Sequence, residues 1–268
     1  MTSSDWDAVR LFADYLRVTG VAHIDPEPAG DPALRGKRLG VLNGSSWITL
    51  WSNLFGHRYL PGVHLINVGN EAVQINFMEA HAQGQPAPPQ SNIDTFTRYA
   101  RDLVELAHVN AVLITCSTMN RAYPAVQQAL KPYGVPVVQI DRPMMERAVK
   151  RGGRVLVVAT HGPTVASTQA LLRETADASA QAVSFCGITV AEAWRRLAVG
   201  DVEGHNAALS AAIRAKLAEE PGIDCVVLAQ LSMTVLLLSY PDPVVEFGVP
   251  ILTSGQCGFE YVRSLLTG

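Results

Sequence analysis

The chain has 268 residues, a formal net charge of −3, 17% charged residues and 48% hydrophobic residues. Its lysines and arginines are scattered, which excludes the concentrated basic surface by which proteins bind nucleic acid or an anionic membrane. The hydrophobic content supports a substantial buried core and excludes a disordered chain. The longest apolar runs, such as Val235–Leu238, are far shorter than the ~18–20 residues that a membrane span needs.

The cysteines, the N-terminus and the missing motifs narrow the class of protein further. Cysteines 116, 186, 225 and 257 show no CxxC or metal-type spacing, which is typical of free thiols in a reduced compartment. Residues 1–5 have neither the basic flank nor the apolar core of a signal peptide, so we predict a cytoplasmic protein. GxGxxG, GxxxxGK[ST] and GxSxG motifs are absent, as are metal-ligand spacings. We therefore expect no nucleotide cofactor and no metal.

In chain order, the first predicted element is a helix over Asp5–Arg17 that Ser4 can cap. A Pro/Asp-rich linker at 25–32 follows, and we treat residues 1–36 as an N-terminal helix and linker. From there apolar runs predict eight strands, over 39–42, 64–68, 111–115, 136–140, 154–159, 181–185, 225–229 and 250–252. Helical patterns cover 94–106, 164–175, 190–198 and 203–218.

Part of the chain is repeated. Residues 110–119 align with residues 224–233, and 135–138 with 249–252, each pair 114 positions apart. Residues 38–42 also resemble 154–158. A duplicated unit of alternating strands and helices predicts an α/β fold with two pseudo-symmetric lobes, each a mostly parallel β-sheet flanked by helices, and an active-site cleft between them. We expect residues 37–143 plus 254–268 in the first lobe and 144–253 in the second.

The two copies of the repeat differ at one important position. Cys116 ends the strand of the first copy, where Gln230 ends that of the second. A helix start after Cys116 would lower the pKa of its thiol and make a base or nucleophile, although a small buried hydrophobe is an equal alternative. Gln230 can donate hydrogen bonds but cannot act as a base. Of the other thiols, Cys257 follows a strand end and could approach the cleft, whereas Cys225 lies inside a predicted strand and is expected in the core.

The loops after the first strand of each lobe are rich in glycine and small polar residues: Asn43-Gly44-Ser45-Ser46 and Thr160-His161-Gly162-Pro163-Thr164. Such loops expose backbone N–H groups that can bind a carboxylate, although ordinary capped turns remain an alternative. His161 titrates near neutrality and should face the cleft.

Each of two further charged residues, Glu71 and Arg142, has alternative predicted roles. Glu71 could reach the cleft rim or cap a helix. Arg142 could pair with a substrate carboxylate or with Asp141 or Glu146.

The motifs Thr115–Met119, Ile140–Met144, Ala159–Thr164 and Val227–Met233, in this order, resemble the aspartate/glutamate racemase superfamily over residues 37–268. This superfamily includes hydantoin racemase, maleate isomerase and arylmalonate decarboxylase. The resemblance implies two α/β lobes, no cofactor, and thiols that move a proton at a carbon next to a carboxylate. It implies catalytic roles for Cys116 and His161. The implied substrate-binding residues are Asn43, Gly44, Ser45, Ser117, Thr118, Thr160, Gly162, Gln230 and Leu231.

Gln230 departs from the family pattern, because a racemase has its second cysteine there. The sequence predicts a cofactor-independent racemase or isomerase acting on a small organic or amino acid, with Cys116 as thiolate base or nucleophile. One alternative is a one-cysteine decarboxylase or lyase similar to arylmalonate decarboxylase. Another is a non-catalytic carboxylate-binding protein. The expected partner is a small carboxylate, with neither nucleic acid nor membrane, and assembly into a homo-oligomer is left open.

Overall fold

The computed structural model describes residues 8–19 and 30–268. Helix α1 (Ala8–Thr19) is the one predicted over Asp5–Arg17. Residues 5–7 of that prediction, and residues 25–29 of the predicted linker, lie outside the described residues.

Eight strands form two separate four-stranded sheets with the same strand order. The first sheet is ordered β2-β1-β3-β4, from β1 (Arg38–Asn43), β2 (His64–Gly69), β3 (Ala111–Ile114) and β4 (Val137–Gln139). The second is ordered β6-β5-β7-β8, from β5 (Arg154–Ala159), β6 (Ser184–Thr189), β7 (Cys225–Leu228) and β8 (Ile251–Thr253). Every pairing is parallel. The predicted α/β fold with two lobes is confirmed.

The strands form where apolar runs are long enough to be buried on both faces of a parallel sheet. Every residue of β3 and of β7 is buried. The predicted strand bounds agree with the structure to within two residues at each end, except for β6. We predicted this strand over Gln181–Phe185, and it runs from Ser184 to Thr189. As an edge strand it is only partly buried, so its apolar pattern is weak.

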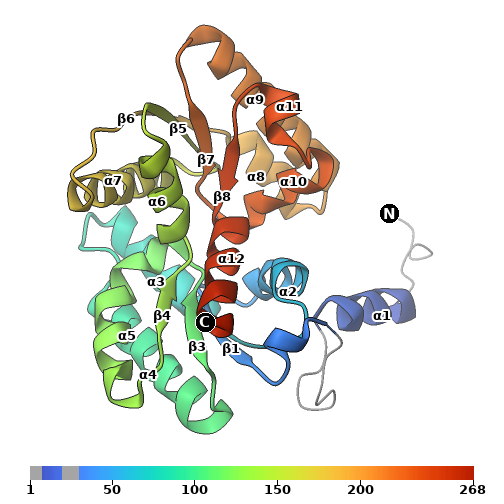
Figure 1. Ribbon diagram of the computed structural model, residues 1–268, viewed down its shortest axis with the longest axis vertical. Coiled ribbons are helices and arrows are strands. Elements are labelled where there is room, and N and C mark those ends of the chain that lie inside the picture. The colour runs from blue at the N-terminus through green and yellow to red at the C-terminus, as the bar shows by residue number, and fades with distance from the viewer. Residues whose placement is uncertain (1–7, 20–29) are drawn as a thin grey trace.

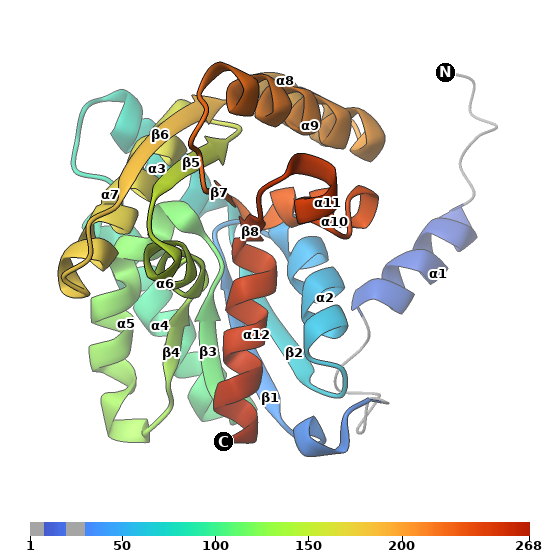
Figure 2. The same cartoon turned by 45° about the horizontal axis from the view of Figure 1, so that its top comes forward.

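Helices cover both faces of each sheet (Figures 1 and 2). In the first lobe α2 (Ile48–Tyr59) and α12 (Ser254–Thr267) lie on one face, and α4 (Gln90–Ala107) and α5 (Tyr123–Leu130) on the other. The remaining elements are α3 (Glu71–Ala82), α6 (Arg142–Arg151), α7 (Gly162–Ala178), α8 (Ala191–Ala198), α9 (Val202–Glu219), α10 (Leu236–Ser239), α11 (Pro243–Phe247) and the 3₁₀ turns η1 (Pro32–Leu34), η2 (Ser117–Ala122), η3 (Lys131–Tyr133) and η4 (Leu231–Val235). No helix within the described ranges is both long and apolar enough to cross a membrane.

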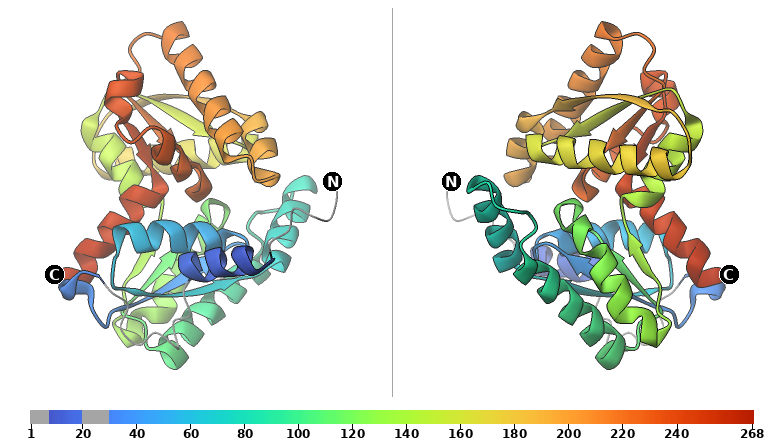
Figure 3. Two further views of the ribbon diagram at one scale, coloured as in Figure 1. Left: turned by 90° about the vertical axis from the view of Figure 1, so that its right-hand side faces the viewer. Right: turned by 90° about the vertical axis from the view of Figure 1, so that its left-hand side faces the viewer.

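Helix α12 joins the lobes. It starts directly after β8 of the second sheet and runs back along the first lobe (Figure 3). Its buried residues Phe259 and Val262 belong to the same apolar cluster as Leu39 of β1. Gly258 allows the close approach, because a Cβ there would lie 2.5 Å from Cγ1 of Ile140, at the chain's other passage between the lobes. The two passages of the chain between the lobes, at Ile140 and at the start of α12, therefore pack against each other, and we call this contact the joint.

We expect Gly258→Ala to lower the free energy of unfolding by about 1–3 kcal/mol, because the added methyl group overpacks this joint. Urea denaturation followed by circular dichroism measures the change. Ser264→Ala, on the exposed side of the same helix, is the control and should change the stability by less than about 0.5 kcal/mol. Equal stability of Gly258→Ala and the wild type would contradict the close packing described here.

Candidate active site

A cavity of about 620 Å³ lies between the two lobes, within the size range of small-molecule sites. It is bounded by the loops after β3, β5 and β7 and by α3 and α8. It brings together eight of the residues predicted for the site: Cys116, Ser117, Thr118, Thr160, His161, Gly162, Gln230 and Leu231. The carboxyl ends of parallel strands from both lobes therefore meet at one cavity, as expected for open α/β sheets.

Cys116 lies at the end of β3, at the start of η2. Its Sγ is 2.9 Å from Oγ1 of Thr118. Burial raises the pKa of the thiol above its ordinary value, although the Thr118 hydroxyl and backbone N–H groups of Thr118 and Met119 act in the opposite direction. The helix start therefore acts on this pKa in the predicted direction, but desolvation outweighs it, and the net shift is upward.

Ser117 links the two lobes directly. Its hydroxyl donates a hydrogen bond of 2.8 Å to the carbonyl of Ala229, the residue before Gln230. The Ser117 hydroxyl proton is thus engaged within the protein. A role of Ser117 in substrate binding would then use its backbone N–H or the lone pairs of its hydroxyl.

The first residues after β1 do not line the cavity, although Trp47 at the end of the same loop does. Asn43 is 1% exposed, and its amide oxygen accepts hydrogen bonds from the hydroxyls of Ser52 (2.8 Å) and Thr115 (2.5 Å). A Cβ at Gly44 would lie 2.4 Å from Cys116 Sγ, so only glycine fits there unless the thiol moves. Ser45 is buried as well. Substrate binding by Asn43, Gly44 and Ser45 remains a prediction, and the structure places them as support for β3 and Cys116.

On the second lobe, the Gln230 amide has a fixed orientation. Its Oε1 accepts hydrogen bonds of 2.8 Å from both the backbone N–H and the hydroxyl of Thr160. Because the oxygen is used in this way, the two N–H donors of the amide are the groups left for a ligand. His161 follows Thr160 and immediately precedes α7. Its ring lies edge-on to Trp194, with 5.2 Å between the centroids. Partial burial lowers the pKa of His161.

Sequence reasoning missed the role of Asp141, a carboxylate that is 2% exposed at the start of α6. Asn120 Nδ2 donates to it at 2.7 Å, yet burial raises its pKa from 3.8 to about 6. Its charge also contributes to raising the pKa of Cys116. Asp141 appeared in the sequence only as a possible partner of Arg142, which instead pairs with Glu146 at 3.2 Å.

The other candidates lie outside the cavity. Cys225 and Cys257 are buried in the core of the second lobe, where desolvation raises the pKa of each thiol to about 11. Cys186 is partly buried on the edge strand β6. Glu71 accepts a hydrogen bond of 3.0 Å from the backbone of Ser46. In the part of the chain that the structure describes, no group of three His, Cys, Asp or Glu residues could hold a metal ion.

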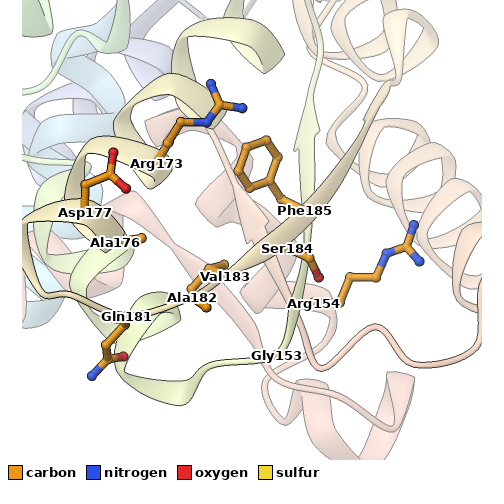
Figure 4. A pocket seen from close by; sticks show the side chains of 10 residues that line it. All are labelled: Gly153, Arg154, Arg173, Ala176, Asp177, Gln181, Ala182, Val183, Ser184 and Phe185. Atoms are coloured by element: carbon orange, nitrogen blue, oxygen red, sulfur yellow. The ribbon is translucent and has the colours of Figure 1, made fainter.

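A second hollow of about 570 Å³ lies on the outer side of the second lobe, between α7 and β6 (Figure 4). Arg173 lies over the ring of Phe185 there, 5.0 Å from its centroid. None of the residues predicted for the site lines this hollow. The chemistry-bearing groups therefore belong to the interlobe cavity.

Fold and site together define a two-lobed α/β protein with a single thiol in the cavity between its lobes. A family model described as Asp/Glu/Hydantoin racemase matches residues 68–262. The chain belongs to this family and is a racemase-type enzyme, which confirms the resemblance seen in the sequence. No curated protein matches the chain significantly.

Solved structures of racemases share the fold. An aspartate racemase homologue from Pyrococcus horikoshii superposes with a TM-score of 0.62 at 18% identity, over 87% of this chain and 100% of that one. Allantoin racemase from Klebsiella pneumoniae gives 0.58 at 20%, over 86% and 87%. Glutamate racemase from Francisella tularensis in complex with D-glutamate gives 0.59 at 16%, over 86% and 81%. At these identities the likeness concerns the fold.

We expect the buried Asp141 carboxylate to make stability depend on pH. Its folded-state pKa of about 6 lies above the ordinary 3.8, so the unfolded chain loses the proton first and stability falls as pH rises between these values. Relative to Asp141→Asn, the wild type should lose about 3 kcal/mol of unfolding free energy from below pH 3.8 to above pH 6. Urea denaturation of both proteins across this range measures the difference. A difference that does not change with pH would contradict the raised pKa.

Proposed function

We propose that this enzyme moves a proton at the carbon next to the carboxylate of a small organic or amino acid, with Cys116 and His161 as its two acid–base groups. One observation carries the proposal: the thiol comes from the first lobe, the imidazole comes from the second, and both line the same cavity. A carbon held between them would have a proton-transfer group on each side. The family membership supports this type of reaction.

The directions of the two pKa shifts support a division of roles. The raised pKa of Cys116 keeps its thiol protonated near neutrality, and the lowered pKa of His161 keeps its imidazole neutral. In one direction His161 accepts the proton from carbon, and the C–H electron pair passes into an enediolate. Cys116 then donates its proton to the opposite face of the same carbon. The reverse reaction uses the thiolate as base and the imidazolium as acid.

The enediolate carries extra negative charge on the carboxylate oxygens and needs hydrogen-bond donors. In our proposal the free N–H groups of Gln230 supply part of this, because Thr160 occupies the amide oxygen. A donor placed where charge develops contributes about 3–4 kcal/mol to transition-state stabilisation. Gln230 thereby acts as a neutral donor at the position where a two-thiol site has a second acid–base group.

A one-thiol decarboxylase is the second candidate, and Gln230 is the observation that favours it. An amide cannot exchange a proton with carbon near neutral pH. From a substrate with two carboxylates on one carbon, loss of one as carbon dioxide leaves an enediolate on the other. That enediolate needs only one protonation, which Cys116 alone could supply. The two candidates differ in whether His161 takes part in the reaction.

We expect the wild-type enzyme in deuterated water to exchange the C2 proton of its substrate and to lose optical activity, as followed by NMR and polarimetry over a panel of small carboxylates. Cys116→Ser and His161→Gln should each slow racemisation by about 10²–10⁴-fold, since each removes one proton-transfer group. Cys186→Ser, a thiol outside the cavity, is the matched control.

The contrary outcomes point to the alternatives. Release of carbon dioxide that depends on Cys116 but not on His161 would establish the decarboxylase. Unaltered ligand affinity in Cys116→Ala, with no turnover over the whole panel, would indicate a binding protein.

We also predict a broad pH profile of kcat/KM for racemisation. Activity should rise through a pKa below 6.5, the ordinary value of histidine, and fall through a pKa above 9.0, that of cysteine. Both reaction directions need one proton on the pair, so they share this profile. The measurement is kcat/KM in each direction from pH 5 to pH 10. If kcat/KM both rose and fell with apparent pKa values between 6.5 and 9.0, the assignment of Cys116 and His161 as the acid–base pair would be contradicted.

A further inference from the structure

We infer that the substrate carries a planar apolar arm, such as an aryl group, and one negative charge only. The inference rests on the proposed function for the position of the reacting carboxylate. It is carried by a separate feature of the cavity, the apolar part of its lining. We call this feature the aromatic wall and define it as Trp47, Ile48, Phe77, Met78 and Trp194.

The aromatic wall draws on both lobes. Trp47 belongs to the first lobe, directly before α2, and Trp194 to α8 of the second. The two indole rings meet edge-on, with centroids 5.5 Å apart, and Trp194 makes a second edge-on contact with His161. The wall therefore begins at the catalytic histidine and continues across the opening between the lobes.

Part of this wall is exposed although its residues are large and apolar. Trp47 is 41% exposed and Met78 is 52% exposed. Exposed apolar surface that lines a concave site is typical of a ligand-binding groove. Aromatic side chains bind flat apolar groups by stacked or edge-on contacts in addition to area burial. An aryl arm that extends from the reacting carbon would cover this surface.

The charges around the cavity argue against a second carboxylate. Of the described residues that line it, none is a lysine or an arginine. An adjoining hollow of about 540 Å³ does contain Arg121 and Arg142, and it shares five lining residues with the cavity: Phe77, His81, Ser117, Thr118 and Pro163. Arg121 pairs with Glu174 at 2.8 Å and Arg142 with Glu146 at 3.2 Å. A carboxylate arm against the aromatic wall would lose its hydration without gaining a lysine or arginine partner. His81, which also lines the cavity, stacks its ring on Phe77 with centroids 6.4 Å apart.

The first test compares three acids by isothermal titration calorimetry on the full-length wild-type protein. 2-Phenylpropionate has the aryl arm, propionate lacks any arm, and succinate has a charged arm. We expect 2-phenylpropionate to bind at least about tenfold more tightly than either of the others. Equal or tighter binding of succinate, or no measurable binding of 2-phenylpropionate, would overturn the inference.

The second test changes the wall. Trp194→Ala should weaken the binding of 2-phenylpropionate by about tenfold, which corresponds to about 1.4 kcal/mol of lost contact, and Trp194→Phe should restore most of it. Arg195→Ala, the next and exposed residue of the same helix, is the matched control and should bind as the wild type does. Unchanged affinity in Trp194→Ala would also overturn the inference. The ligand comparison on the wild type stands even if a variant does not fold.

The failures of the two proposals can be told apart by adding deuterium exchange to these measurements. Binding of 2-phenylpropionate that depends on Trp194, without any exchange at its C2 position, would overturn the proposed proton transfer and leave the aryl arm standing. Exchange at the C2 position of aspartate that depends on Cys116, with no preference for the aryl acid, would support the proposed proton transfer and overturn the aryl arm.

Discussion

The hydrogen bond from Ser117 to the carbonyl of Ala229 connects the ends of β3 and β7, the two corresponding strands of the duplicated unit. Cys116 and Gln230 lie immediately beside its two partners in the sequence. Since each strand is buried along its whole length, its carboxyl end has little freedom to move. The thiol and the amide are thus positioned by strand ends that contact one another, and short side chains suffice to reach the cavity.

Behind the thiol lies a buried polar region at the passage between the lobes. Asp141, Asn120 and Ser254 each have a side-chain oxygen that is buried without a hydrogen-bond partner among the described residues. Burial away from water raises the pKa of both the Asp141 carboxyl and the Cys116 thiol. Unsatisfied polar groups cost folding free energy, and natural proteins retain them mainly at functional sites.

Much of the fold could be predicted because buried parallel strands leave a plain apolar signal, and because the repeat between residues 110–119 and 224–233 ties the two lobes together. The same repeat brought Cys116 and Gln230 to attention. β6 was misplaced because an edge strand is only half-buried. Helices α2, α3, α6 and α12 were not predicted, and α12 follows β8 without an intervening loop.

The aromatic wall and the state of the thiol could not be predicted for a different reason. Trp47 and Trp194 are far apart in the sequence, and only the packing of one lobe against the other brings their rings together. The pKa of Cys116 depends on how much water reaches the thiol, and a motif does not contain this information. Asp141 was visible in the sequence, but its burial was not.

Gln230, at the position where the resemblance implies a second cysteine, also positions the neighbouring loop. A cysteine at this position could not reach and accept hydrogen bonds from both the N–H and the hydroxyl of Thr160 as the longer amide does. Thr160 directly precedes His161, so these two bonds fix the backbone from which the imidazole extends. Gln230 therefore also holds the loop that carries the histidine. In the proposed mechanism, one side chain thus donates hydrogen bonds to the enediolate and positions the imidazole.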